Sequence, residues 1–333
     1  MLEPNVPLRA RPWRVAVAPM MDWTDRHCRF FHRLLSPHTR LYTEMMTTGA
    51  LIHGDLARHL NFNSEEHPVG LQIGGSEPAD LAHCAQLGER WGYDEINLNC
   101  GCPSERVQRG AFGACLMAEP ELVADCVKAM RDAVSVPVTV KHRTGIDQEM
   151  SFAFLSDFVG RVSEAGCEVF IVHARNAWLK GLSPKENREL PPLRYDLVHR
   201  LKREYPGLTI CINGGIKTED QMHEQLALVD GVMLGREAYH NPYMMSHWDQ
   251  AFFGESRWVP TRDEIEEAMC EYMEREAAHR GTPWRSIARH MLGLRLGMPD
   301  ARRWRQVWSD HRLREWRPAQ VMHAARPREL LAA

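Results

Sequence analysis

The chain has 333 residues, of which 44% are hydrophobic and 26% are charged. This composition is ordinary for a folded protein and excludes a disordered or collagen-like chain. The length predicts one large domain with a small one, or two domains of similar size. The formal net charge of −3 gives by itself no reason to expect a nucleic-acid partner.

The cysteines and the N-terminal residues indicate the compartment. There are nine cysteines, an odd number, scattered among apolar and helical patterns, which favours reduced thiols in the cytosol over disulfides. Residues 1–14 carry Glu3, Arg9, Arg11 and Arg14 and contain no apolar core of a signal peptide. No run approaches the roughly 20 apolar residues of a membrane span. We therefore expect a cytoplasmic protein with no membrane contact.

Short apolar runs that are rich in β-branched residues recur along the first three quarters of the chain. Such runs predict strands that are buried on both faces. There are eight of them: Val15–Met20, Leu41–Met46, Pro68–Gly74, Glu95–Cys100, Pro137–Arg143, Val169–Ala174, Leu208–Gly214 and Gly231–Arg236.

Between these runs lie segments that are compatible with helices, including residues 78–91, 119–134, 152–165 and 218–228. Eight strand and helix units in about 240 residues match the size of a (β/α)8 TIM barrel. The alternative is a doubly wound sheet, but no G-x-G-x-x-G follows the first strand and the chain has no P-loop. The barrel is the favoured architecture.

The pattern changes after Arg236. Residues 254–262 have the composition of a linker, and the rest of the chain is helical in character, with helices expected over 263–279, 283–296 and 301–311. Thr261 and Glu264 have the spacing of a capping box for the first of these helices. We predict a barrel domain over residues 1–250 and a small helical domain over residues 251–333.

In barrel enzymes the chemistry gathers where the strands end. The glycine pair Gly214 and Gly215 and the dipeptide Gly235–Arg236 follow the last two strands, where barrels commonly bind phosphate through backbone N–H groups. A tight turn that needs positive φ would explain such a glycine pair without any ligand. Their position on two adjacent strands favours phosphate binding.

Lys141 is one of six lysines in a chain with 35 arginines, and it lies within an apolar strand. An unpaired buried ammonium is costly, so this residue is expected to have a function. It could form a Schiff base, as in aldolase-type barrels, or supply a fixed positive charge beside a cofactor that gains electrons. Gln72 could bind an amide-like ring edge. His173 is either part of the same site or an ordinary buried histidine.

Cys102 lies two residues beyond the fourth strand, on a loop shaped by Gly101 and Pro103. A loop thiol can act as a nucleophile or, because it is mostly protonated at neutral pH, as a general acid. Cys100, Cys102 and Cys115 lack a fourth ligand at a usable spacing, so no metal site is predicted. Cys100 is expected to pack against the barrel.

Several long motifs occur in order from about Trp13 to about Trp308. They are Val17–Asp25, Asn97–Ser104, Arg106–Met117, Lys141–Gly145, His173–Arg175 and Asn213–Ile216. Together they resemble the motifs of the tRNA-dihydrouridine synthases. Leu182–Arg188 and Arg289–Gly293 resemble the subgroup that acts on uridines 20 and 20a of the tRNA D-loop.

The resemblance implies FMN as the cofactor and NADPH as the reductant. It implies hydride transfer from FMN N5 to uracil C6 and proton transfer from Cys102 to C5, on a uridine flipped out of the RNA. Asn99 would hydrogen-bond the flipped base. The residues implied to bind FMN are Pro19, Met20, Met21, Gln72, Lys141, His173, Asn213, Gly214, Gly215, Gly235 and Arg236.

Two other classes of function remain open at this stage. A flavoenzyme of the dihydroorotate dehydrogenase kind, which reduces or oxidises a free pyrimidine, would share the barrel and FMN but would not need a basic helical region. A tRNA-binding protein without catalysis would use the barrel as a scaffold. No obligate protein partner is evident.

The local charge reverses the first inference about nucleic acid. Residues 275–328 contain 13 arginines, no lysine and four acidic residues, a local charge of +9, so the rest of the chain must carry −12 if the total is −3. Lys185, Arg188, Arg302 and Arg305 are the candidates for contact with tRNA. Trp284, Trp304, Trp308 and Trp316 in the same region are expected to form the core of the helical domain, with stacking on RNA as the alternative.

Overall fold

The computed structural model describes residues 11–256 and 258–326. The chain divides into two compact units: one contains the residues up to Asp22 together with Thr39–Gly235, and the other contains Trp23–His38 and the chain from Arg236 onward. The predicted domain boundary after residue 250 stays a prediction. The two units group Trp23–His38 and residues 236–250 with the C-terminal helices rather than with the strands.

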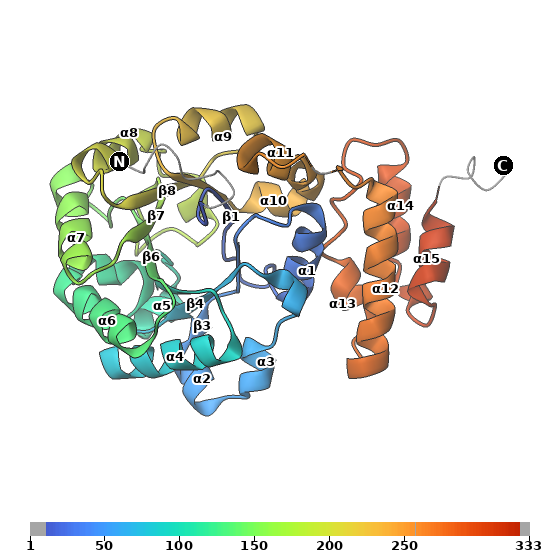
Figure 1. The fold of residues 1–333 in the computed structure, drawn as a ribbon, viewed down its shortest axis with the longest axis horizontal. Helices are drawn as coiled ribbons and strands as arrows, with labels where there is room; N and C mark the ends of the chain where they lie inside the picture. The colour runs from blue at the N-terminus through green and yellow to red at the C-terminus, as the bar shows by residue number, and fades with distance from the viewer. Residues whose placement is uncertain (1–10, 257, 327–333) are drawn as a thin grey trace. The chain divides into compact units, whose positions relative to one another are not determined.

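The strands of the first unit form one parallel sheet that closes into a barrel (Figure 1). The sheet order is β1-β9-β8-β7-β6-β5-β4-β2, and β3 also pairs with β4. Closure comes from Arg40: its carbonyl accepts from the N–H of Val17 at 2.9 Å, and its N–H donates to the carbonyl of Val15 at 3.0 Å. The predicted barrel is confirmed. The strands are β1 (Val15–Val17), β2 (Leu41–Tyr42), β3 (Met46–Thr47), β4 (Val69–Gly74), β5 (Glu95–Cys100), β6 (Val138–Arg143), β7 (Val169–His173), β8 (Thr209–Asn213) and β9 (Gly231–Leu234).

The second predicted strand, Leu41–Met46, is interrupted in the structure. Tyr42 pairs with Gly70 and Met46 pairs with Ile73, so this segment holds one residue more than the facing stretch of β4. The extra residue makes a bulge that splits the strand into β2 and β3. At the bulge, the Thr43 hydroxyl accepts a hydrogen bond from the N–H of Gln72 at 3.0 Å.

Helices cover the outside of the barrel (Figure 1). Two of the long ones, α4 and α6, begin with a proline at the first helical position, where the missing N–H costs nothing. Helix α4 ends at Gly92, which adopts a φ of 92° as the cap. The helices of this unit are α2 (Thr48–His53), α3 (Leu56–Leu60), α4 (Pro78–Trp91), α5 (Glu105–Arg109), α6 (Pro120–Ala133), α7 (Phe152–Glu164), α8 (Tyr195–Glu204) and α9 (Glu219–Leu226).

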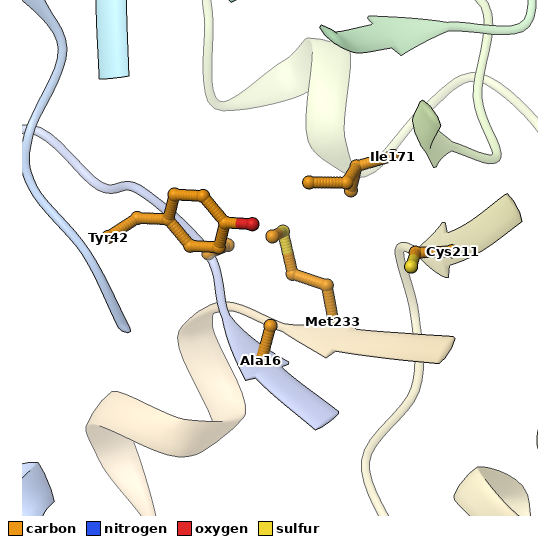
Figure 2. Packing of buried hydrophobic residues seen from close by; sticks show 6 residues of the cluster. Ala16, Tyr42, Ile171, Cys211 and Met233 are labelled. Carbon is orange, nitrogen blue, oxygen red and sulfur yellow. The ribbon is translucent and has the colours of Figure 1, made fainter. Parts of the chain in front are cut away.

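Apolar side chains fill the interior of the barrel. In Figure 2 the side chains of Tyr42, Met233 and Ile171 point toward one another between strands that lie far apart in the sequence. Beside them the fully buried carboxylate of Glu95, at the start of β5, accepts from Trp13 at 2.8 Å and is paired with Arg40 at 2.9 Å. The interior near the strand starts is therefore packed and internally satisfied, which leaves the strand ends as the place for a site.

The second unit consists of helices in the part of the chain that the structure describes. Its core includes Trp304 and Trp308, whose indole N–H groups both donate to the buried carboxylate of Glu266 at 2.7 Å. Arg295 completes the pairing of that carboxylate at 2.7 Å. The α-helices are α1 (Arg26–Leu35), α10 (Arg236–His240), α11 (Trp248–Phe253), α12 (Arg262–Arg280), α13 (Trp284–Ala288), α14 (Ala301–Trp308) and α15 (Pro318–Ala325).

The capping box of Thr261 and Glu264 at the start of α12 is confirmed. The helix predicted over 283–296 is wrong in length, because α13 ends at Ala288 and a series of turns follows, in a stretch where Gly293 and Gly297 weaken any helix. Of the four tryptophans expected in the core, Trp284, Trp304 and Trp308 are buried, whereas Trp316 is 44% exposed.

Candidate active site

The carboxyl ends of the strands bring the predicted polar residues together. Pairing in register places Asn97 beside Gln72, Lys141 beside Asn99, and Arg143 and Asn213 on either side of His173. Because all these strands are parallel, their polar side chains collect at the same end of the barrel.

A chain of side-chain amides crosses from β4 to the loop after β5. Gln72 donates to Asn97 at 2.7 Å and accepts from Asn99 at 2.9 Å. The side-chain oxygen of Asn99 accepts from the backbone N–H groups of Gly101 at 3.1 Å and Cys102 at 3.0 Å. Asn99 was expected to bind a base, and the structure shows that its oxygen shapes the loop that carries Cys102.

The thiol of Cys102 is half-buried and lies 3.5 Å from the hydroxyl of Ser104. Cys100 is fully buried, and burial raises its pKa well above the usual range. Cys115 is also half-buried, and burial is the main cause of its raised pKa. Cys102 is therefore more accessible to solvent than Cys100, and unlike Cys115 it has the Ser104 hydroxyl next to its thiol. Within residues 11–256 and 258–326, no group of three or more His, Cys, Asp or Glu residues could hold a metal ion.

Two positive groups, Lys141 and Arg143, interact electrostatically with Cys102. The ammonium of Lys141 donates to the side-chain oxygen of Asn213 at 3.2 Å, and no carboxylate pairs with it among the described residues. Burial, and after it the neighbouring Arg143, lowers the pKa of Lys141 to about 7. Burial is also the main cause that lowers the pKa of His173 well below its usual value, with Arg143 and Lys141 acting in the same direction. His173 is therefore neutral at physiological pH, and Lys141 can gain or lose its proton there.

Bare backbone lies next to these side chains. Gly214 and Gly215 have φ values of 112° and 75°, a region that L-amino acids other than glycine rarely adopt. A Cβ on Gly214 would lie 2.6 Å from the His173 ring, and the Gly214 carbonyl accepts from the Tyr195 hydroxyl at 2.5 Å. The first turn of α9, which follows, carries Glu219 and Asp220, so its helix terminus is already balanced by negative charge. If this loop binds an anion, the glycine N–H groups are the better donors.

The other predicted cofactor residues are placed as follows. Pro19 and Met20 are half-buried after β1, and Met21 is 55% exposed. A Cβ on Gly235 would lie 3.6 Å from the Met20 sulfur, so the segment after β1 lies next to Gly235. Arg236 starts α10 and is grouped with the second unit.

The predicted RNA-binding residues are exposed. Lys185 and Arg188 lie in the long segment between β7 and α8. Arg302 and Arg305 lie three residues apart on α14, in the second unit. The count of 13 arginines included Arg328, which lies outside the described residues.

Sequence reasoning left three residues near Cys102 out of the predicted site. Arg143 could have been found from its position, since like Lys141 it is a charged residue at the end of a buried strand. Gln108 lies on the short helix α5 and Asn187 on a 3-10 turn, and although both fall within the motifs Arg106–Met117 and Leu182–Arg188, nothing in the sequence assigned either of them a role of its own.

Comparison with known proteins identifies the family. The family model described as Dihydrouridine synthase (Dus) matches residues 16–326. A protein of Pseudomonas putida named tRNA-dihydrouridine(20/20a) synthase is 61% identical over 298 residues, which are 89% of this chain and 88% of that protein. Proteins of the same name from Salmonella typhi and Vibrio cholerae are 56% and 58% identical, covering 97% and 90% of this chain and 98% and 91% of their own lengths.

Among solved structures, a 2-naphthoyl-CoA reductase in complex with 2-naphthoyl-CoA is similar in fold, with a TM-score of 0.56 and 11% sequence identity. The match covers 71% of this chain and 50% of that one, and it supports the barrel alone. The family model and the relatives agree over nearly the whole chain. The chain therefore belongs to the dihydrouridine synthase family of enzymes.

Proposed function

We propose that this enzyme reduces the C5=C6 bond of uridines 20 and 20a in the D-loop of tRNA, with FMN as cofactor and NADPH as reductant. The observation that carries the proposal is the half-buried Cys102 thiol at the strand-end site of a chain that is 56–61% identical to relatives named for this modification. In the overall reaction uracil gains a hydride at C6 and a proton at C5, and NADPH is oxidised.

The donors at the strand ends fit FMN. Gln72 and Lys141 offer an amide and an ammonium to a polar ring edge, and the N–H groups of Gly214 and Gly215 suit a phosphate. Pro19, Met20, Met21, His173, Asn213, Gly235 and Arg236 complete the proposed set. When bound, FMN would supply the hydride for C6.

Cys102 would act as the general acid at C5. The S–H group of a protonated thiol can donate its proton to a carbon that gains a hydride at the neighbouring position. Asn99 accepts a hydrogen bond from the Cys102 N–H, which fixes the backbone that carries the thiol. Lys141 would stabilise negative charge next to it, because a group whose pKa is about 7 takes up a proton readily when an anion arrives.

Positive residues outside the strand ends would hold the RNA. The uridine must leave its stack to reach the site, and phosphate contacts would keep the flanking nucleotides in place meanwhile. Lys185 and Arg188 are exposed on the segment after β7, and Arg302 and Arg305 are exposed on α14. We propose residues 1–250 as the catalytic region and residues 251–333 as the tRNA-binding region.

The location of the protein stays a prediction. No helix among the described residues is long and apolar enough to cross a membrane. The proposal places the enzyme in the cytoplasm because tRNA is its substrate.

The test uses tRNA from a bacterial strain that lacks its own enzyme for these positions. Complementation with this chain should restore dihydrouridine at positions 20 and 20a, as mapped by mass spectrometry of RNase fragments. Purified protein should retain FMN, and unmodified tRNA should speed the reoxidation of the reduced flavin whereas free uridine should not. Dihydrouridine formed from the free nucleoside alone would instead support the free-pyrimidine class.

Cys102→Ala should give a yellow protein that NADPH still reduces but that forms no dihydrouridine. Cys115→Ala is the matched control, since it removes another half-buried thiol and should leave activity unchanged. Full activity of Cys102→Ala would refute the acid role.

A further inference from the structure

We propose that Gln108 is a positioning residue that ties the Cys102 loop to the segment between β7 and α8, and so holds the thiol in line for proton transfer. The proposal rests on the proposed function and adds to it a residue that acts through Cys102. It is carried by hydrogen bonds on both sides of the cysteine.

The N–H group of Cys102 and the carbonyl groups of Gly101, Cys102 and Pro103 all have hydrogen-bond partners. Asn99 holds the N–H of Cys102, and the Cys102 carbonyl accepts from Ala114 at 2.9 Å. The carbonyl of Pro103, in contrast, accepts from the side-chain amide of Gln108 at 2.8 Å. The carbonyl of Gly101 accepts from the guanidinium of Arg143 at 3.0 Å.

Both of these side chains also reach the segment after β7. The same amide nitrogen of Gln108 donates to the carbonyl of Leu179 at 2.7 Å. Arg143 donates to the carbonyl of Asn187 at 2.9 Å. Gly101 and Pro103, which flank Cys102, are thus each connected through one side chain to the segment after β7, and the bond from Gln108 to Leu179 spans 71 residues of the sequence.

That segment is itself held together as one piece. Asn187 is fully buried, its oxygen accepts from the N–H of Trp178 at 2.7 Å, and its nitrogen donates to the carbonyls of Trp178 at 2.9 Å and Leu182 at 3.2 Å. Asp147, from the loop after β6, accepts from the N–H of Leu179 at 2.8 Å. Because of these bonds, a displacement of this segment would move Leu179 and Asn187 together with it.

The exposed Lys185 and Arg188 lie on the same segment, next to the buried Asn187. When these residues hold the RNA, the bonds through Gln108 and Arg143 keep the thiol in fixed relation to the held nucleotide. A misplacement of about 1 Å at the reacting centre can cost about 100-fold in rate. The side-chain amide of Gln108 donates to the backbone carbonyls of Pro103 and Leu179 and is not among the residues proposed to bind RNA or flavin, so its effect is expected in kcat and not in RNA affinity.

The first test is kinetic. Gln108→Ala should lower kcat for dihydrouridine formation by roughly 10- to 100-fold while KM for tRNA and the rate of flavin reduction by NADPH stay as in the wild type. Gln108→Glu keeps the shape but loses the donor, because an ionised carboxylate only accepts hydrogen bonds. Its activity relative to wild type should rise as pH falls and the carboxyl gains a proton that it can donate. Gln86→Ala and Gln86→Glu, on the exposed face of α4, are the matched controls.

The second test reads the thiol directly and needs neither activity nor tRNA. Alkylation of Cys102 by iodoacetamide, followed by mass spectrometry, should change several-fold in rate in Gln108→Ala, whereas alkylation of Cys115 in the same sample should not change. An unaltered kcat, a rise in KM alone, or an unaltered Cys102 alkylation rate would each overturn the proposal. If the wild type makes no dihydrouridine, the proposed function fails, and the alkylation rates still decide whether Gln108 positions the thiol.

Discussion

The side-chain oxygen of Asn99 accepts a hydrogen bond from the backbone N–H of Cys102 at 3.0 Å, so the last polar residue of β5 determines the path of the loop that follows it. The same oxygen holds the N–H of Gly101 at 3.1 Å. Its amide nitrogen is bonded to Gln72, which joins the Cys102 loop to β4. Asn99 thus connects the rigid barrel to the thiol.

Asn99→Ala removes the acceptor for two backbone N–H groups and the donor to Gln72. We expect the free energy of unfolding to fall by about 1–3 kcal/mol, because buried polar groups lose their partners. Dihydrouridine formation should fall by at least about tenfold, since the Cys102 loop is no longer fixed. Urea unfolding and a kcat measurement check the two effects. Wild-type kcat in a stably folded Asn99→Ala protein would contradict the positioning role of Asn99.

Lys141 gives a prediction about pH. Its pKa in the free protein is lowered to about 7, and a flavin ring carbonyl that accepts a hydrogen bond from the ammonium would raise that pKa. Flavin affinity should therefore be greatest below pH 7 and should weaken above it, by up to about tenfold per pH unit, until the pKa of the bound form is passed. Lys141→Met should show weaker binding without this pH dependence.

Fluorescence quenching titrations of the flavin-free protein measure this affinity. Riboflavin should be used beside FMN, because it lacks a phosphate group that titrates near pH 6. The same affinity of wild type at pH 6 and pH 9 for both flavins would show that the charge of Lys141 does not hold the ring.

The strands and the polar residues at their ends could be predicted from the sequence for a physical reason. A buried parallel strand must be apolar on both faces, so a polar side chain at its end, such as Asn99 or Lys141, stands out against the pattern. The bulge at Thr43 could not be foreseen, because it depends on pairing with β4. Gln108 and Asn187 were missed because their side chains bond to backbone carbonyls, near in sequence for Asn187 and both near and far for Gln108, and such bonds leave no periodic pattern.

His142 gives a prediction about stability at mild acid pH. The ring is fully buried against Phe158 and Phe170, and burial lowers its pKa from 6.5 to about 4. As pH falls below 6.5 the unfolded chain binds a proton that the folded protein does not bind, so stability decreases with falling pH and levels off near pH 4. Between pH 7 and pH 5 this single group should cost about 2 kcal/mol of the free energy of unfolding.

His142→Leu removes that titration while it keeps an apolar side chain against the two phenylalanines. It also removes a hydrogen bond of the ring to the carbonyl of Arg143, 2.7 Å long, so the variant is expected to be less stable at pH 7. The difference in free energy of unfolding between pH 7 and pH 5, from urea titrations, should be about 2 kcal/mol smaller than in wild type. An equal difference in both proteins would show that His142 is not the group responsible.

Arg302 and Arg305 are exposed on α14 and three residues apart, so they lie on the same face of that helix. If each contacts a phosphate, Arg302→Ala and Arg305→Ala should each weaken tRNA binding and reduce the slope of log K against log salt by about 1, because fewer counterions are released on binding. NADPH oxidation by the protein in the absence of tRNA should not change. Arg161→Ala is the matched control, since Arg161 is also exposed but paired with Asp157 on α7 at 2.9 Å. Filter binding at several salt concentrations measures the slopes. If Arg302→Ala or Arg305→Ala has the same slope as Arg161→Ala, the phosphate contact proposed for that arginine is wrong.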